Sequence, residues 1–186
     1  MLIGLSGTFG SGKDTVAKMF ESHGFEHFST ADILRQESLK LGRTIERDSL
    51  RVTANELRQK YGSGYLAEKA IERATKENIL ISAIRSKGEI DLVKSQPDSK
   101  IVFVDAPVEI RYERIFKRKR HLEDEATLEE FKKSEAAELR GDNNSQFVSY
   151  CRDSADVILE NAGTEAELQK KVDELLVNLM KDKEQK

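Results

Sequence analysis

The first fifteen residues constrain the fold of this chain more than any other stretch. An apolar run at 2–5 ends at a glycine-rich turn, and a helix-compatible segment follows at 14–21. Glycines let backbone N–H groups turn inward without Cβ clashes, so such a turn forms a concave nest for an anion. The N-terminus of the following helix directs its donors and partial positive charge toward the same point. This order of strand, glycine loop and helix predicts a phosphate-binding loop.

The spacing within this loop predicts a nucleoside triphosphate as its ligand. Gly7 to Lys13 fits G-x-x-x-x-G-K, in which the lysine reaches the outer phosphates as a point charge. Asp14 follows where a hydroxyl is usual, and the hydroxyl comes one position later at Thr15. A plain glycine turn before a capped helix is the alternative, which the combination of strand, spacing, lysine and helix disfavours. The residues expected to contact the nucleotide here are Gly7, Phe9, Gly10, Ser11, Gly12, Lys13, Asp14 and Thr15.

Composition limits the class of protein. A chain of 186 residues suits one domain, and 38% hydrophobic with 35% charged residues is typical of a globular enzyme with solvated helices. No apolar run approaches the roughly 20 residues that cross a bilayer, and we expect no signal peptide before the first strand. Cys151 is the single cysteine, so an internal disulfide is excluded and a cytoplasmic location is expected. A net charge of −3 makes nucleic acid an unlikely partner.

Apolar runs alternate with helical segments along the whole chain. This alternation predicts an α/β three-layer core with a mostly parallel five-stranded sheet, in which ligands gather at the carboxyl ends of the strands. The expected strands are 2–5, 25–28, 79–81, 100–105 and 156–159, and the expected helices are 14–21, 31–41, 47–60, 65–76, 87–94, 108–119 and one from residue 164. The segment 120–144 is almost entirely charged, which is typical of surface helices.

The loop after the second strand carries Asp32 and Arg35, three residues apart on one helical face. An arginine can clamp a phosphate in two places, and an aspartate can orient a nucleophilic oxygen or a metal-bound water. A surface ion pair is the alternative.

The loop after the third strand reads Ser82-Ala-Ile-Arg85. The usual partner of a phosphate loop is an acidic residue at the end of a neighbouring strand, where it organises Mg²⁺. Ser82 occupies that place here, and Arg85 is available for an acceptor phosphate.

The loops after the fourth and fifth strands supply further candidates. Arg111, Arg114 and Arg118 form one stripe on the helix after the fourth strand, and arginines are the usual protein groups that close over a transferred phosphoryl group. A solvated helix face is the alternative. After the last strand, the loop from Asn161 to Gly163 offers an amide and backbone groups that can contact the edge of an adenine ring.

The phosphate loop and the loops after the other strands together resemble the nucleoside monophosphate kinase group of P-loop kinases. The resemblance covers nearly the whole chain. The run 10–15, Gly-Ser-Gly-Lys-Asp-Thr, is similar to the adenylate kinase loop. The run 29–35, Ser-Thr-Ala-Asp-Ile-Leu-Arg, resembles the acceptor signature S-T-G-D-x-L-R, whose arginine binds the acceptor phosphate. The run 113–118 is similar to the entry of the adenylate kinase lid, which implies that Arg114 packs on adenine and Arg118 meets phosphate.

Other stretches resemble different members of the group. The runs 102–107 and 155–163 are similar to dephospho-CoA kinases. Arg85, Glu89 and the upstream Tyr61-Gly62 most resemble an archaeal-type group of nucleotide-kinase-like proteins, which commonly has Asp-Gly where this chain has Ser82-Ala83.

The resemblance implies one P-loop kinase domain over 1–186, with acceptor-binding helices at about 30–76 and a lid at about 120–144. It implies an ATP-dependent, Mg²⁺-requiring small-molecule kinase with a nucleotide-like acceptor, most readily a nucleoside monophosphate. The alternatives are phosphorylation of a ribose hydroxyl, as in dephospho-CoA kinases, and an ATP-binding switch or ATPase without kinase activity. No membrane partner is expected, and both a monomer and a dimer remain open.

The expected kinase activity assigns metal-binding, catalytic and substrate-binding roles to particular residues. With no acid at position 82, Asp14 and Thr15 are the candidate metal ligands, although Asp14 is equally well explained as a favourable first-turn residue. The expected catalytic residues are Lys13, Asp32, Arg85 and Arg118; the acceptor-binding residues are Asp32, Arg35 and Arg85; and Arg114, Asn161 and Gly163 join the nucleotide site.

Overall fold

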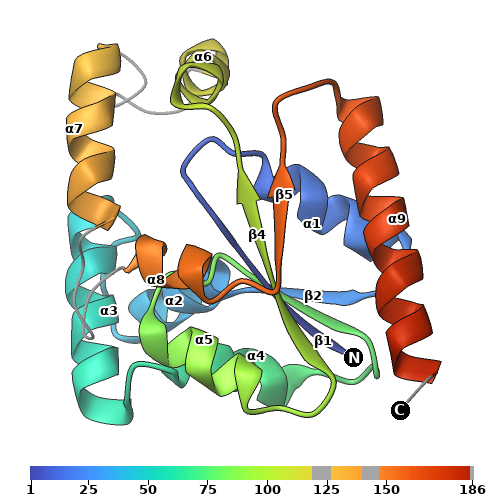
Figure 1. The fold of residues 1–186 in the computed structure, drawn as a ribbon. Helices are drawn as coiled ribbons and strands as arrows, with labels where there is room; N and C mark the ends of the chain where they lie inside the picture. The colour runs from blue at the N-terminus through green and yellow to red at the C-terminus, as the bar shows by residue number, and fades with distance from the viewer. Residues whose placement is uncertain (119–126, 140–146, 185–186) are drawn as a thin grey trace.

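The computed structural model describes residues 1–118, 127–139 and 147–184 (Figure 1). In chain order the elements are β1 (Leu2–Gly7), α1 (Lys13–Ser22), β2 (Glu26–Ser29), α2 (Thr30–Lys40), α3 (Arg47–Tyr61), α4 (Tyr65–Arg73), β3 (Ile79–Ser82), α5 (Lys87–Lys94), β4 (Ser99–Asp105), α6 (Val108–Arg118), α7 (Leu128–Leu139), α8 (Val148–Asp153), β5 (Val157–Glu160) and α9 (Glu165–Glu184).

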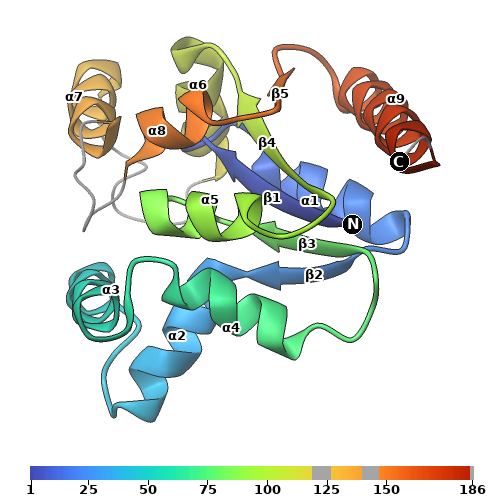
Figure 2. The same cartoon turned by 60° about the horizontal axis from the view of Figure 1, so that its bottom comes forward.

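The strands form one sheet in the order β2-β3-β1-β4-β5, and every pairing in it is parallel. The predicted five-stranded, mostly parallel sheet is confirmed, and it is parallel throughout. Helical connections between successive strands return the chain to the same end of the sheet, which parallel pairing requires. β1 lies at the centre between β3 and β4, so the loop after β1 is flanked by the ends of both neighbours (Figure 2).

Alternate residues of the central strands bury opposite faces of the sheet, as the period of two along a strand dictates. Ile3 and Leu5 pack with α1 and α9 in one apolar cluster. Leu2, with Ile81 of β3 and Phe103 of β4, packs with α2 to α5 and α8 in the other. The result is the expected three-layer arrangement, with helices on both faces of the sheet (Figure 2).

The ends of most elements differ from the expected bounds by one to three residues. The helix α8 was not predicted, because it has only six residues and buries just Val148 and Cys151. The C-terminal helix α9, expected from residue 164, spans Glu165–Glu184. Within the described ranges, no helix is both long and apolar enough to cross a membrane.

The connection after β3 is held at three successive carbonyl groups by different parts of the chain. Thr30 Oγ1 donates to the Ala83 oxygen at 2.8 Å, and Ser6 Oγ donates to the Ile84 oxygen at 2.7 Å. The backbone N–H of Phe147, just before α8, donates to the Arg85 oxygen at 2.7 Å. These contacts fix the backbone that carries Arg85 before any ligand binds.

Ala83 adopts a φ of 61° in this connection, a region that glycine occupies without a Cβ clash. We expect Ala83→Gly to raise the free energy of unfolding by roughly 0.5–1 kcal/mol, because the relief of left-handed strain exceeds the added chain entropy. Urea denaturation measures this change. Ala74→Gly is the matched control, since Ala74 has a φ of −69° and should lose stability instead. A loss of stability in Ala83→Gly would contradict the strain argument.

Candidate active site

The loop between β1 and α1 requires glycine at specific places. Gly10 and Gly12 have φ values of 81° and 92°. A Cβ on Gly7 would lie 2.5 Å from the Val104 oxygen, and one on Gly12 would lie 2.4 Å from Asn161 Nδ2. Larger residues are therefore excluded by contacts with the ends of β4 and β5, and the loop backbone stays open for an anion.

The Ser11 side chain lies on the inner side of the loop, where a Cβ on Gly7 would come within 2.9 Å of its Oγ. The residue is fully buried, and its Oγ has no hydrogen-bond partner. A buried hydroxyl without a partner costs about 1–3 kcal/mol. Because solvent does not reach this oxygen, a phosphate at the open side of the loop does not reach it either. The fit to the predicted triphosphate rests instead on the open glycine backbone and the N-terminus of α1.

The Asn161 amide braces the loop from the end of β5. Its Nδ2 donates to the Ser11 oxygen at 2.8 Å, and its Oδ1 accepts from Arg114 Nη2 at 3.3 Å. Arg114 Nη1 also reaches the Ser11 oxygen at 3.5 Å, and burial lowers the pKa of this guanidinium. The sequence expected Asn161 to contact an adenine edge, whereas its amide is engaged with the loop itself. Gly163 is exposed at the start of α9.

The Arg111 side chain makes contacts within the protein and does not face the phosphate site, contrary to what the arginine stripe had suggested. It forms a bidentate ion pair with Glu135 of α7, and the side chains are only 6% and 15% exposed. Its Nε donates to the Ala106 oxygen at 2.7 Å, and its Nη1 donates to the Phe9 oxygen at 3.3 Å. Arg111 thus ties the loop and the end of β4 to α7. The Phe131 ring adds to this junction, 6.2 Å from the Phe9 ring between centroids.

The predicted lid lies only partly within the described residues. Its described part is α7, which lies beside α6 (Figure 1). Residues 119–126 and 140–146 are outside the described ranges. Arg118 is the last residue of α6, and its side chain lies outside the described part of the chain.

The head of α1 presents the residues predicted to bind phosphate and metal. Lys13 is the first residue of the helix and is half-buried. Asp14 in the first turn is exposed, and Thr15 is half-buried with its N–H donating to the Gly12 oxygen at 3.0 Å. Hydroxyl and carboxylate oxygens are ligands that Mg²⁺ accepts. Among the described residues, no group of three or more His, Cys, Asp or Glu side chains could hold a metal.

On the acceptor side, Asp32 and Arg35 lie in α2 and form an ion pair at 2.5 Å. Their side chains are 64% and 48% exposed, so a ligand can reach both. Ser29 Oγ caps the helix by accepting from the Asp32 N–H. Arg85 is half-buried, with its backbone N–H donating to Glu89 Oε2 at 2.9 Å. The roles of these three polar residues stay predictions.

An acidic residue does end a strand next to the loop, and sequence reasoning gave it no role. Asp105 closes β4, where its Oδ1 accepts from Thr8 Oγ1 at 3.0 Å and from the Ala106 N–H at 2.9 Å. Arg152 Nε lies 3.4 Å from its Oδ2. The sequence does show Asp105 at the end of an expected strand, but only the strand order shows that this strand, β4, borders β1. The Asp105 carboxylate therefore supports the start of the phosphate loop.

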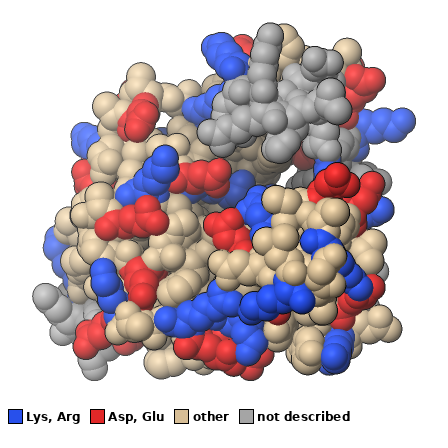
Figure 3. Space-filling view, turned by 180° about the vertical axis from the view of Figure 1, so that it is seen from behind, with Lys and Arg blue, Asp and Glu red and all other residues tan. Residues whose placement is uncertain are grey.

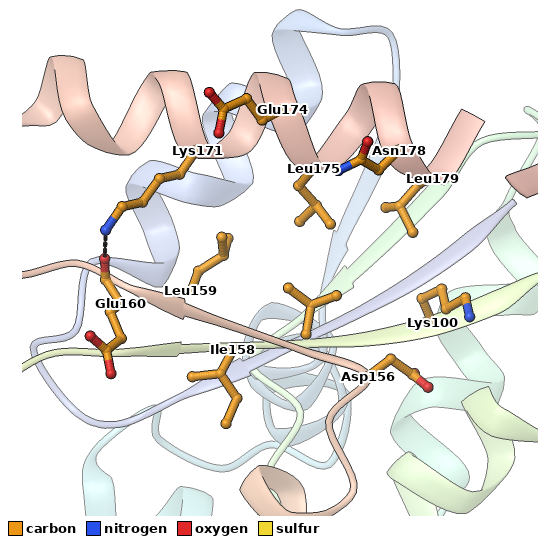
Figure 4. Close-up of a pocket in the computed structure, with 11 residues that line it drawn as sticks. Lys100, Asp156, Ile158, Leu159, Glu160, Lys171, Glu174, Leu175, Asn178 and Leu179 are labelled. Atoms are coloured by element: carbon orange, nitrogen blue, oxygen red, sulfur yellow. Dashed lines mark hydrogen bonds between the residues drawn. The ribbon is translucent and has the colours of Figure 1, made fainter. Parts of the chain in front are cut away.

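Two surface features lie away from this loop. An open groove of about 530 Å³ runs between β5 and α9, and Lys171 Nζ donates across it to the Glu160 oxygen at 2.6 Å (Figure 4). On the face in Figure 3, positive and negative side chains are interspersed.

Comparisons with known proteins agree with this geometry. A family model described as an AAA domain matches residues 6–132. A UPF0200 protein of Thermococcus kodakarensis is 31% identical over 191 residues, which cover 96% of this chain and 100% of that protein. The chain belongs to the UPF0200 family. Another UPF0200 protein, from Sulfurisphaera tokodaii, is 32% identical over 180 residues, or 96% of this chain and 97% of that one.

Solved structures of small-molecule kinases share the fold of this chain. A shikimate kinase from Acinetobacter baumannii, in complex with shikimate, matches with a TM-score of 0.60 and 20% identity over 95% of this chain and 93% of its own. A dephospho-CoA kinase from Campylobacter jejuni matches with a TM-score of 0.53 and 15% identity over 96% of each chain. At these identities the likeness establishes the fold. The predicted P-loop, nucleoside monophosphate kinase-like fold is confirmed, and a P-loop domain implies nucleotide binding.

Proposed function

We propose that this chain is an ATP-dependent kinase that transfers the γ-phosphoryl group to a nucleotide-like acceptor, most readily a nucleoside monophosphate. The observation that carries the proposal is the braced glycine loop at the head of α1, in which the positive φ values of Gly10 and Gly12 leave the backbone open to an anion. The loop N–H groups and the head of α1 stabilise the charge of a triphosphate. Lys13 then lies at the outer phosphates, where charge develops during transfer.

The acceptor would bind across the ends of β2 and β3. Arg35 of α2 and Arg85 after β3 supply the positive charge that an acceptor phosphate requires. A phosphate acceptor needs no strong base, so clamping by arginine is enough. For an acceptor hydroxyl, Asp32 would take the proton. Mg²⁺ brought in with ATP neutralises phosphate charge, and Thr15 with Asp14 would hold it.

The test is a panel of acceptors with ATP and Mg²⁺, in which formation of ADP and of the phosphorylated product is followed by chromatography. Nucleoside monophosphates, their deoxy forms and dephospho-CoA are the probes. We expect acceptor-dependent product with one or more monophosphates. If product forms only with dephospho-CoA, the protein phosphorylates a ribose hydroxyl and not a nucleoside monophosphate. Release of inorganic phosphate that no acceptor alters would instead identify an ATPase.

Arg35 separates acceptor binding from ATP binding. Arg35→Ala should raise the KM for the acceptor about tenfold or more, because a charge-assisted hydrogen bond to phosphate is lost, and should leave the KM for ATP unchanged. Arg51→Ala is a matched control, since Arg51 also pairs with an aspartate three residues away and is 73% exposed in α3. Equal changes in both KM values would contradict an acceptor role for Arg35.

A further inference from the structure

The serine at the end of β3 is part of a hydrogen-bonded relay. Ser82 Oγ lies 2.7 Å from His27 Nε2, and His27 Nδ1 lies 2.7 Å from Glu21 Oε1. The three side chains come from β3, β2 and α1, so the fold and not local sequence brings them together. Carboxylate, imidazole and hydroxyl in series is an arrangement that sets the direction of hydrogen bonds at the hydroxyl.

The relay lies beside the phosphate loop. Ser82 pairs with Leu5 of β1, two residues before Gly7. Its side chain lies on the same sheet face as Leu80, the face that α1 covers. Ser82 is 7% exposed, and the His27 side chain is 20% exposed.

With the His27 ring neutral, the relay determines which hydrogen bonds the Ser82 hydroxyl donates and accepts. A carboxylate only accepts hydrogen bonds, so Glu21 requires the hydrogen on His27 Nδ1. In the neutral ring Nε2 is then an acceptor, and the Ser82 hydroxyl must donate to it. The remaining lone pairs of Ser82 are left to accept a hydrogen bond from another group. A serine held in this way presents the same kind of group, a hydrogen-bond acceptor, as the carboxylate that usually ends this strand.

We propose that Glu21 and His27 position Ser82 as a neutral acceptor for the hydration shell of the Mg²⁺–ATP substrate. The inference rests on the proposed function, because it assigns Ser82 to the substrate of that same site. In this assignment Glu21 and His27 are positioning residues, and Ser82 is the acceptor that they orient. The relay explains how the phosphate loop works without an acid at the end of β3.

The experiment compares ATP affinity with Mg²⁺ and with EDTA, by calorimetric titration of the full chain. Ser82→Ala and His27→Ala should each weaken Mg²⁺–ATP binding about fivefold to tenfold, the effect of one lost hydrogen bond, and leave metal-free ATP binding unchanged. His23→Ala is the matched control, since His23 also contacts a carboxylate, Asp173 at 3.2 Å, but not Ser82. It should change neither affinity.

The outcomes separate this inference from the proposed function. Wild-type protein that binds no ATP would overturn both. Normal Mg²⁺–ATP binding in Ser82→Ala, or equal weakening with and without Mg²⁺, would overturn the relay alone. Intact mass after incubation with ATP gives a further check. A gain of one phosphoryl group that is absent in Ser82→Ala would identify Ser82 as a nucleophile and overturn its role as a hydrogen-bond acceptor.

Discussion

Lys13→Ala is expected to lower the rate of phosphoryl transfer about 100-fold or more while the protein stays folded. The lysine contributes a positive charge where negative charge develops on the transferred group, and this contact is stronger in the transition state than in the ground state. Its side chain is not part of either apolar cluster. The loss should therefore appear in turnover and not in packing.

The direction in which Lys13→Ala changes the free energy of unfolding can also be predicted. Lys13 begins α1, where the helix dipole opposes a positive charge, so its removal should leave the free energy of unfolding unchanged or raise it by roughly 0.3–1 kcal/mol. Thermal unfolding without nucleotide measures this, and coupled ADP assays measure turnover. Lys18→Ala is the control, because Lys18 is an exposed residue of the same helix and should keep its full rate. A Lys13→Ala variant with wild-type turnover would refute the phosphate-loop assignment.

Arg111→Ala is expected to lower the free energy of unfolding by about 3–5 kcal/mol, since it leaves the Glu135 carboxylate, only 15% exposed, without its partner. The Ala106 and Phe9 oxygens would also lose their donor. Urea denaturation measures the change. Replacing Arg111 and Glu135 together by leucine should cost less than Arg111→Ala, because no unpaired buried charge remains.

An exposed ion pair of the same helix supplies the comparison for Arg111. Lys132 of α7 lies 3.6 Å from Glu109, and their side chains are 40% and 60% exposed. Lys132→Ala should cost at most about 1 kcal/mol. If Arg111→Ala costs no more than this control, the junction between α6, α7 and the phosphate loop is not a stabilising one.

Local sequence was sufficient to predict the fold where one short stretch carries the whole signal. The glycine spacing and Lys13 predicted the turn between β1 and α1, because positive φ values and a helix start are local properties. The helix at Lys87–Lys94 was likewise predicted with its observed bounds, and Ser86 with Glu89 forms a capping box at its start.

Partners that come from distant parts of the chain could not be predicted in this way. Periodicity placed Arg111 and Arg114 on one helix face, but not which neighbour that face would meet. The structure directs Arg111 to Glu135 and Arg114 to Asn161. The partnership of Ser82 with His27 likewise depends on β2 pairing with β3. Strand order is a property of the whole fold, so these contacts have no local signature.

The packing of α8 on β1 gives the protein an internal chemical reporter. Cys151 of α8 is fully buried, and burial raises the pKa of its thiol to about 12. Alkylating reagents attack the thiolate, so at neutral pH they should modify this cysteine only when α8 separates from the sheet. Because Cys151 is the one cysteine of the chain, its labelling rate reads a single site. That rate measures how often the strand leading into the phosphate loop loses its cover, and a slower rate with nucleotide would reveal coupling between the ligand and this packing.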